Sequence, residues 1–171
     1  MKVRDLDTDV RIQLGRGSYM PVLMKLVAMT TGPIVELGCG YVSTPYLHWA
    51  CFSTKRPLVS YEDHPEWYGF ASRFACDFHT VHHVTDWDAL DFSGPCSVAF
   101  VDHNNHRRKL DIPRLAHAEY VVIHDTENAE DRKYRMGRPI LQYQYRLKYH
   151  EAGGPATSVV SNVHDLSGVI V

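Results

Sequence analysis

The 171-residue sequence lacks the marks of several common protein classes. Its four cysteines form no C-x-x-C pair, which argues against a zinc knuckle or a dithiol redox site. No apolar run approaches the ~20 residues of a membrane span, and the first ten residues do not resemble a signal peptide. The net charge of -2 gives no general attraction to nucleic acid or anionic membranes. We therefore expect a cytoplasmic protein with neither as a partner.

The length and the composition favour a single domain over residues 1–171. With 44% hydrophobic and 22% charged residues, the chain can bury one substantial core. Residues 1–17 are polar, and we expect them to form an N-terminal arm or lid. Apolar residues at helical spacing then predict a helix over 20–29, which Ser18 can cap.

Short β-branched runs then alternate with longer amphipathic stretches. The expected strands are residues 33–37, 57–61, 79–84, 96–101 and 120–123, and the expected helices are residues 43–52, 65–76 and 107–116. This alternation predicts an α/β fold with a mostly parallel sheet and helices on both faces. The β-rich stretches 140–150 and 157–171 are joined by too few residues for a crossover helix. They should form an antiparallel hairpin at the sheet edge.

A glycine turn follows the first expected strand, with Gly38 and Gly40 two residues apart. Glycine at this edge of a parallel sheet lets a ligand lie against bare backbone. Ser43 stands where the dinucleotide fingerprint G-x-G-x-x-G requires its third glycine, so the match to that motif is incomplete. Glu36, just before the turn, would repel a phosphate but can help hold a cationic amino acid group.

Acidic residues end the next two strands. Glu62 lies about 20 residues past the glycine turn, where a carboxylate can accept both ribose hydroxyls of an adenosine ligand. Asp86 can accept from an adenine amino group while Trp87 covers a ring face. The alternative interpretations are that Glu62 merely begins a helix, where acidic residues suit the dipole, and that Asp86 and Trp87 form an ordinary turn.

The order of these motifs resembles the class I S-adenosylmethionine-dependent methyltransferases. The resemblance rests on Glu36-Leu37-Gly38-Cys39-Gly40, Glu62 before Pro65, Val101-Asp102, Ile123-His124-Asp125 and the terminal hairpin. Residues 101–106, with Asp111 and His124-Asp125, are similar to the small O-methyltransferase group that includes catechol-type and sugar methyltransferases and cephalosporin hydroxylase-like proteins. This resemblance implies a Rossmann-like methyltransferase fold with seven strands and S-adenosylmethionine as the cofactor. It also implies a small polar acceptor that is methylated at oxygen.

The sequence also departs from this group. Val42 stands where many members keep another glycine, and Asn104 and Asn105 occupy the region where the catechol-type enzymes have a lysine. That lysine base therefore cannot be transferred to this chain. His103, His106 and His124 flank the rim, and any of them can take the proton of the acceptor. Of the three we favour His106 as the base, because it lies four residues after Asp102 and resembles a histidine common in the group.

Asp102 and Asp125 end neighbouring strands and should meet at one rim beside the glycine turn. We predict them, with His106, as the catalytic residues. Asp102, Asp125 and Asn128 supply oxygen donors that suit a divalent cation such as Mg²⁺, which in the resembling group anchors vicinal hydroxyls. The alternative is that Asp102 only hydrogen-bonds the substrate and Asp125 caps the next helix. The sequence leaves metal dependence open.

Methyl transfer from a sulfonium needs alignment and the loss of one proton, which agrees with the absence of a nucleophile-elbow motif. Two other functions remain open: a non-catalytic S-adenosylmethionine-binding accessory protein, and an NAD-dependent oxidoreductase. The short N-terminal region offers little wall around a substrate, and a homo-oligomer would supply one. The basic runs 107–109 and 132–138 contact either solvent or an anionic acceptor.

Overall fold

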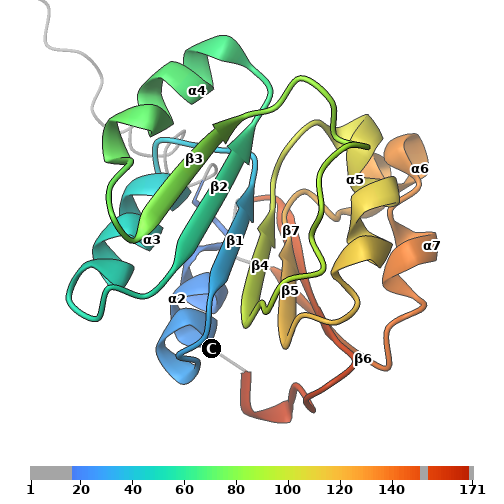
Figure 1. The fold of residues 1–171 in the computed structure, drawn as a ribbon. Coiled ribbons are helices and arrows are strands. Elements are labelled where there is room, and N and C mark those ends of the chain that lie inside the picture. The colour runs from blue at the N-terminus through green and yellow to red at the C-terminus, as the bar shows by residue number, and fades with distance from the viewer. Residues whose placement is uncertain (1–16, 151–153, 170–171) are drawn as a thin grey trace, which may run out of the picture.

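The computed structural model describes residues 17–150 and 154–169. In these residues seven strands form one sheet in the order β3-β2-β1-β4-β5-β7-β6 (Figure 1). The strands are β1 (Ile34–Leu37), β2 (Leu58–Glu62), β3 (His79–His83), β4 (Val98–Val101), β5 (Tyr120–Ile123), β6 (Tyr145–His150) and β7 (Ala156–Ser161). The first five are parallel, and β7 pairs antiparallel with both β5 and β6. The predicted parallel sheet and terminal hairpin are confirmed.

Helices cover both faces of the sheet, as predicted. Figure 1 shows α2 and α3 on one side and α5, α6 and α7 on the other. The helices are α2 (Met20–Met29), α3 (Ser43–Phe52), α4 (Pro65–Ala71), α5 (Asn105–Asp111), α6 (Asn128–Tyr134) and α7 (Gly137–Ile140), with 3₁₀ turns η1 (Ser72–Phe74), η2 (Ile112–Leu115) and η3 (Ser167–Val169). None of the described helices is long and apolar enough to cross a membrane.

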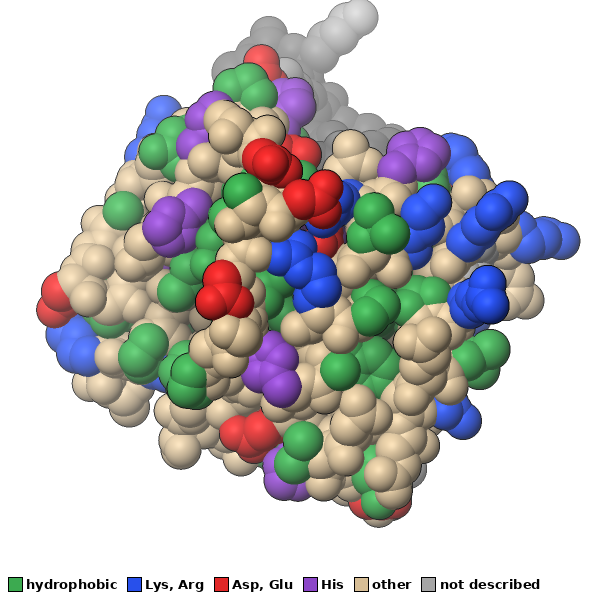
Figure 2. All heavy atoms as spheres, turned by 45° about the vertical axis from the view of Figure 1, so that its right-hand side comes forward, with side chains coloured by type: hydrophobic (Ala, Val, Ile, Leu, Met, Phe, Trp, Pro, Cys, Tyr) green, Lys and Arg blue, Asp and Glu red, His purple; other side chains and the backbone are tan. Residues whose placement is uncertain are grey.

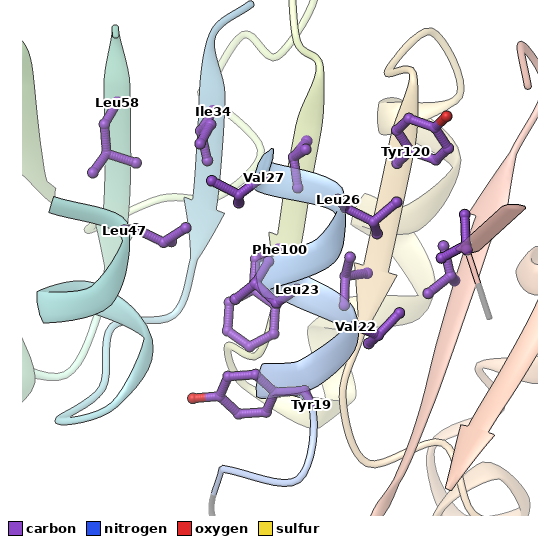
Figure 3. Close-up of a cluster of buried hydrophobic side chains, with 14 of the residues drawn as sticks. Tyr19, Val22, Leu23, Leu26, Val27, Ile34, Leu47, Leu58, Phe100 and Tyr120 are labelled. Atoms are coloured by element: carbon purple, nitrogen blue, oxygen red, sulfur yellow. The ribbon is translucent and has the colours of Figure 1, made fainter. Parts of the chain in front are cut away.

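Each central strand feeds two cores, because successive side chains point to opposite faces of a sheet. Phe100 joins the cluster under α2 and α3, whereas its neighbour Val101 joins the cluster under η2 and α7. Leu23 and Leu26 of α2 are fully buried against the first face (Figure 3). Burying such a side chain is worth roughly 1.5–3 kcal/mol, so these contacts hold α2 on the sheet.

The structure corrects the prediction that Ser18 caps α2. The N-cap is Tyr19, which makes no side-chain capping bond. The Ser18 hydroxyl is buried and donates instead to the carbonyl of Pro155 at 2.9 Å. Ser18 therefore bonds to a residue far away in the sequence and not to the first turn of α2. The expected arm over residues 1–17 lies, apart from Gly17, outside the described residues.

The helices predicted over 65–76 and 107–116 both end earlier in the structure, and the second also begins earlier. The first narrows to the 3₁₀ turn η1 after Ala71. The second begins earlier, at Asn105, because the side chain of Asn104 accepts the backbone N–H of His106. It gives way to η2, which contains Pro113, a residue without the N–H that a continuing helix needs.

The strands expected over 140–150 and 157–171 are shorter in the structure. Ile140 ends α7, and the buried hydroxyl of Tyr143 donates to the carbonyl of Ile112 at 2.6 Å, so β6 begins only at Tyr145. β7 ends at Ser161, whose hydroxyl accepts the N–H groups of residues 163 and 164 and turns the chain. The helix α6 was not predicted.

Candidate functional site

A pocket of about 810 Å³ opens at the carboxyl ends of β1, β2, β4 and β5. Its size is within the ~300–1,000 Å³ range of small-molecule sites. The strand order reverses between β1 and β4, the place where open parallel sheets bind ligands. The pocket is lined by Tyr19, Cys39, Gly40, Tyr41, Val42, Glu62, Asp63, His64, Trp67, Asp102, His103, Asn104, His106, Arg108, His124, Asp125, Tyr134 and Pro155.

The two glycines of the turn have different roles. Gly38 has a φ of +91°, and a Cβ there would lie 2.4 Å from the backbone nitrogen of His103, so glycine is needed for the turn to pack against the chain after β4. Gly40 lines the pocket, and its N–H donates to the hydroxyl of Thr44 at 3.0 Å. Of the pair, only Gly40 presents backbone to a ligand.

Glu36 lies beneath the turn, outside the pocket lining. Its buried carboxylate accepts from the hydroxyls of Thr44, at 3.0 Å, and Ser60, at 2.6 Å. Burial raises the pKa of Glu36 to about 7. Ser60 also contacts His79 at 2.9 Å, and His79 lies 3.2 Å from His48. The structure thus gives Glu36 a supporting position in a buried polar chain that the sequence did not reveal.

Glu62 lies in the pocket wall at the end of β2. Its carboxylate accepts the backbone N–H groups of Cys39, at 2.7 Å, and His64, at 2.8 Å. Burial raises its pKa, although these two hydrogen bonds oppose the shift. A carboxylate has about four acceptor sites, so both oxygens keep capacity for a ligand.

Asp86 and Trp87 lie outside the pocket lining. Asp86 is exposed and accepts the backbone N–H of Asp88, as in an ordinary turn. The Trp87 ring is buried 4.4 Å from the ring of His103 and donates to Asp63 at 3.0 Å. Trp87 therefore touches two residues of the pocket lining but does not line the pocket itself. Asp86 and Trp87 form a polar turn with a packed Trp ring, which is the alternative interpretation given above.

His103 is a lining residue that the sequence did not single out for binding. Its Nε2 lies 2.9 Å from the buried carboxylate of Asp111, which fixes the ring. The other nitrogen, Nδ1, is buried and has no hydrogen-bond partner among the described residues. Because Nε2 faces a carboxylate and carries the hydrogen, Nδ1 is assigned as an acceptor. Burial lowers the pKa of His103.

Asp102 and Asp125 come together at the rim, as expected from adjacent strand ends. Ligand atoms of Asp102, His124 and Asp125 all lie within 4.8 Å of one another. His124 Nδ1 is 3.3 Å from Asp102 and 3.4 Å from Asp125. Burial lowers the pKa of His124, but these two carboxylates outweigh it and raise the pKa overall. Burial also raises the pKa of Asp125, whose backbone has a φ of +56°.

A guanidinium stands between the two carboxylates. Arg108 of α5 donates to Asp102 at 2.8 Å and lies 3.5 Å from Asp125. The side chain was expected to face solvent or an acceptor, yet it is only 4% exposed. Arg107 is also bound internally, to Asp88 and Asp111. The run 107–109 is therefore no solvated face.

Two further predicted residues are separated by the structure. His106 lines the pocket mouth, where its exposed ring meets that of Tyr134 at 5.0 Å. Asn128 begins α6 outside the pocket lining and lies 3.4 Å from the amine of Lys148. Of the three predicted metal ligands, only Asp102 and Asp125 reach the pocket.

The second basic run, 132–138, remains on the surface. Its four cations, Arg132, Lys133, Arg135 and Arg138, are all exposed, and no ion pair joins them to another described side chain. On the right-hand side of Figure 2, Lys and Arg side chains gather with no acidic side chain among them.

Sequence comparison finds no matching family model and no matching curated protein. Solved structures are similar, however. The O-methyltransferase from Bacillus cereus in complex with S-adenosylhomocysteine has 14% identity and a TM-score of 0.63, with 94% of this chain and 93% of that chain covered. The chain has the Rossmann-like methyltransferase fold.

Other structures with this methyltransferase fold differ in chemistry. The O-methyltransferase TomG from Streptomyces achromogenes, in complex with S-adenosylmethionine, has 15% identity and a TM-score of 0.62 over 85% of this chain and 79% of that chain. The N-methyltransferase NodS from Bradyrhizobium japonicum has 11% identity and a TM-score of 0.62 over 87% and 96%. At such identities the methyltransferase fold is shared, while the acceptor must be argued from the site.

Proposed function

We propose that this chain is an S-adenosylmethionine-dependent methyltransferase that methylates a small polar acceptor at oxygen. The observation that carries the proposal is one pocket, at the switch point of the sheet, that joins a cofactor-type wall to an acidic rim. Glu62 and Gly40 form the wall, and Asp102 and Asp125 form the rim. The similar structures in complex with S-adenosylmethionine or S-adenosylhomocysteine support the same reading.

The lining residues fit such a cofactor. Glu62 offers acceptors for ribose hydroxyls, and Gly40 leaves its backbone bare. When bound, S-adenosylmethionine supplies a methyl group on a sulfonium sulfur. We assign Glu36 and Gly38 to supporting this wall from beneath.

The rim residues orient the acceptor, and a separate base receives its proton. The hydrogen bonds that Asp102 receives from Arg108 and His124 are both on Oδ1, and no ion pair among the described residues involves Oδ2, so we propose that Oδ2 accepts a hydrogen bond from the acceptor hydroxyl. Transfer forms the bond from the acceptor oxygen to the methyl carbon and breaks the bond from that carbon to sulfur, which keeps the electron pair. The hydroxyl proton passes to a base, for which we propose the exposed imidazole of His106, a residue of the pocket lining.

A calorimetric titration with S-adenosylhomocysteine tests the cofactor wall. Glu62→Ala should weaken binding by about 10- to 100-fold, because a hydrogen bond to a buried charged group contributes roughly 1.5–3 kcal/mol. Asp86→Asn is the matched control: it changes an acidic residue that lies outside the pocket lining, and should bind like the unchanged chain. Equal affinity of the Glu62→Ala variant would contradict the assignment.

A measurement of turnover tests the proposed role of Asp102 in methyl transfer. Hydroxylated small molecules are screened for release of S-adenosylhomocysteine, and Asp102→Asn is compared with the unchanged chain on the acceptor found. The substitution should depress turnover far more than cofactor affinity, since Asp102 faces the acceptor side of the pocket. A variant with normal turnover would remove Asp102 from the proposed chemistry.

A further inference from the structure

We propose that the cation between Asp102 and Asp125 is the protein's own Arg108, and that this rim takes no divalent metal. The resemblance to catechol-type methyltransferases implies Mg²⁺ at these carboxylates, so the donor set can be tested against that ion. The proposal concerns the rim itself. Only its meaning for methyl transfer rests on the proposed function.

Three of the four carboxylate oxygens of Asp102 and Asp125 already face Arg108 or His124. The Nη2 of Arg108 is 2.8 Å from Oδ1 of Asp102, and its Nη1 is 3.5 Å from Oδ2 of Asp125. His124 Nδ1 also approaches Oδ1 of both carboxylates, at 3.3 and 3.4 Å. Like charges placed so close need a cation between them, and a guanidinium stays charged at every physiological pH.

Arg108 is also fixed in place by its other donors. Its Nε donates to the carbonyl of His103 at 2.6 Å, and its Nη1 donates to the carbonyl of His124 at 2.8 Å. These carbonyls adjoin Asp102 and Asp125 along the chain, so the same two loops hold both the carboxylates and the guanidinium. Displacing Arg108 would leave two buried carbonyls without donors, which is unfavourable.

The other groups at the rim do not supply the metal ligands that are lost to Arg108. Mg²⁺ prefers oxygen ligands and is commonly held by one or two carboxylates together with water, but here both carboxylates already pair with Arg108 and the third group is an imidazole. Asn128, the third ligand predicted from the sequence, lies outside the pocket lining, near Lys148. Arg108 is therefore a positioning residue: it neutralises the rim and leaves Oδ2 of Asp102 directed to the acceptor.

The test is a titration of the ligand-free chain with Mn²⁺, followed by the electron paramagnetic resonance signal of the free ion. The unchanged chain should show no saturable binding at the rim. Arg108→Met removes the guanidinium while keeping an apolar stem, and should bind Mn²⁺ at least tenfold more tightly. Arg107→Met is the matched control, because Arg107 bonds to Asp88 and Asp111 instead, and should behave like the unchanged chain.

Saturable Mn²⁺ binding by the unchanged chain, abolished by Asp102→Asn, would overturn the proposal, since the metal would then displace Arg108. This comparison decides the question even if the Arg108→Met variant fails to fold. An Arg108→Met variant that folds without gaining Mn²⁺ affinity would also overturn it. No cofactor enters this titration, so a failure of the methyltransferase proposal, seen as no binding of S-adenosylhomocysteine, is a separate result.

Discussion

Replacing Gly38 by alanine should lower the stability of the fold, whereas alanine at Gly69 should not. Gly38 has a φ of +91°, and an added Cβ would lie 2.4 Å from the backbone nitrogen of His103 and 2.5 Å from the carbonyl carbon of Asp102. The neighbouring backbone cannot easily give way, because Asp102 N donates to the carbonyl of Leu37 at 2.7 Å and Gly38 N donates to that of Tyr61 at 2.9 Å.

Two costs add at this position. A non-glycine residue with positive φ costs roughly 1–2 kcal/mol, and forcing a methyl group into a packed site costs roughly 1–3 kcal/mol. The free energy of unfolding should therefore fall by about 2–5 kcal/mol. For a chain of this length, each kcal/mol lowers the melting temperature by roughly 2–4 °C, so a loss of about 4–20 °C is expected.

Gly69→Ala is the matched control. Gly69 lies inside α4, has no neighbouring atom within 4 Å of an added Cβ, and should gain up to about 1 kcal/mol from the better helix former. Both variants are compared with the unchanged chain by thermal and urea unfolding. A Gly38→Ala variant that melts within about 2 °C of the unchanged chain would refute the packing argument.

Two pH-linked predictions concern buried carboxylates. The pKa of Glu36 is raised from 4.5 to about 7, so the stability it contributes as a neutral acid is full below pH 4.5 and lost as pH rises through 7. Urea unfolding from pH 5 to 8 should show the unchanged chain losing about 3 kcal/mol relative to Glu36→Gln; parallel curves would contradict this. The pKa of Asp111 is lowered to about 2, since bonds from His103, Arg107 and Arg114 outweigh burial, so its contribution is present above pH 3.8 and lost as pH falls through 2. Asp111→Asn should cost about 3–5 kcal/mol at pH 7, and a cost below about 1 kcal/mol would rule out the network.

The sequence predicted correctly those helices and strands whose apolar residues follow a regular spacing. The bounds of α2 and β5 agree with the predicted ranges 20–29 and 120–123. Buried strands and one-sided helices carry their burial pattern in the sequence. α6 was missed for the same reason: its sequence, NAEDRKY, has almost no apolar residues, and hydrophobic periodicity is silent on such a helix.

The site was only partly predictable. Adjacent parallel strands end at the same edge, which brought Asp102 and Asp125 together in the prediction as they are in the structure. The role of Arg108 was hidden, because the run Arg107-Arg108-Lys109 is typical of an exposed helix start. Its key bond to the carbonyl of His124 spans 16 residues and depends on how α5 packs beside β5. A contact of this kind cannot be predicted from the local sequence pattern.

The most direct test of the methyltransferase account is a calorimetric titration of the unchanged chain with S-adenosylhomocysteine and, separately, with NAD. The account predicts saturable, one-to-one binding of S-adenosylhomocysteine, weakened by Glu62→Ala, because the pocket joins an acidic ribose acceptor to a turn without the third glycine of the dinucleotide fingerprint. It predicts no binding of NAD under the same conditions. Binding of NAD with no binding of S-adenosylhomocysteine would contradict it and favour an oxidoreductase.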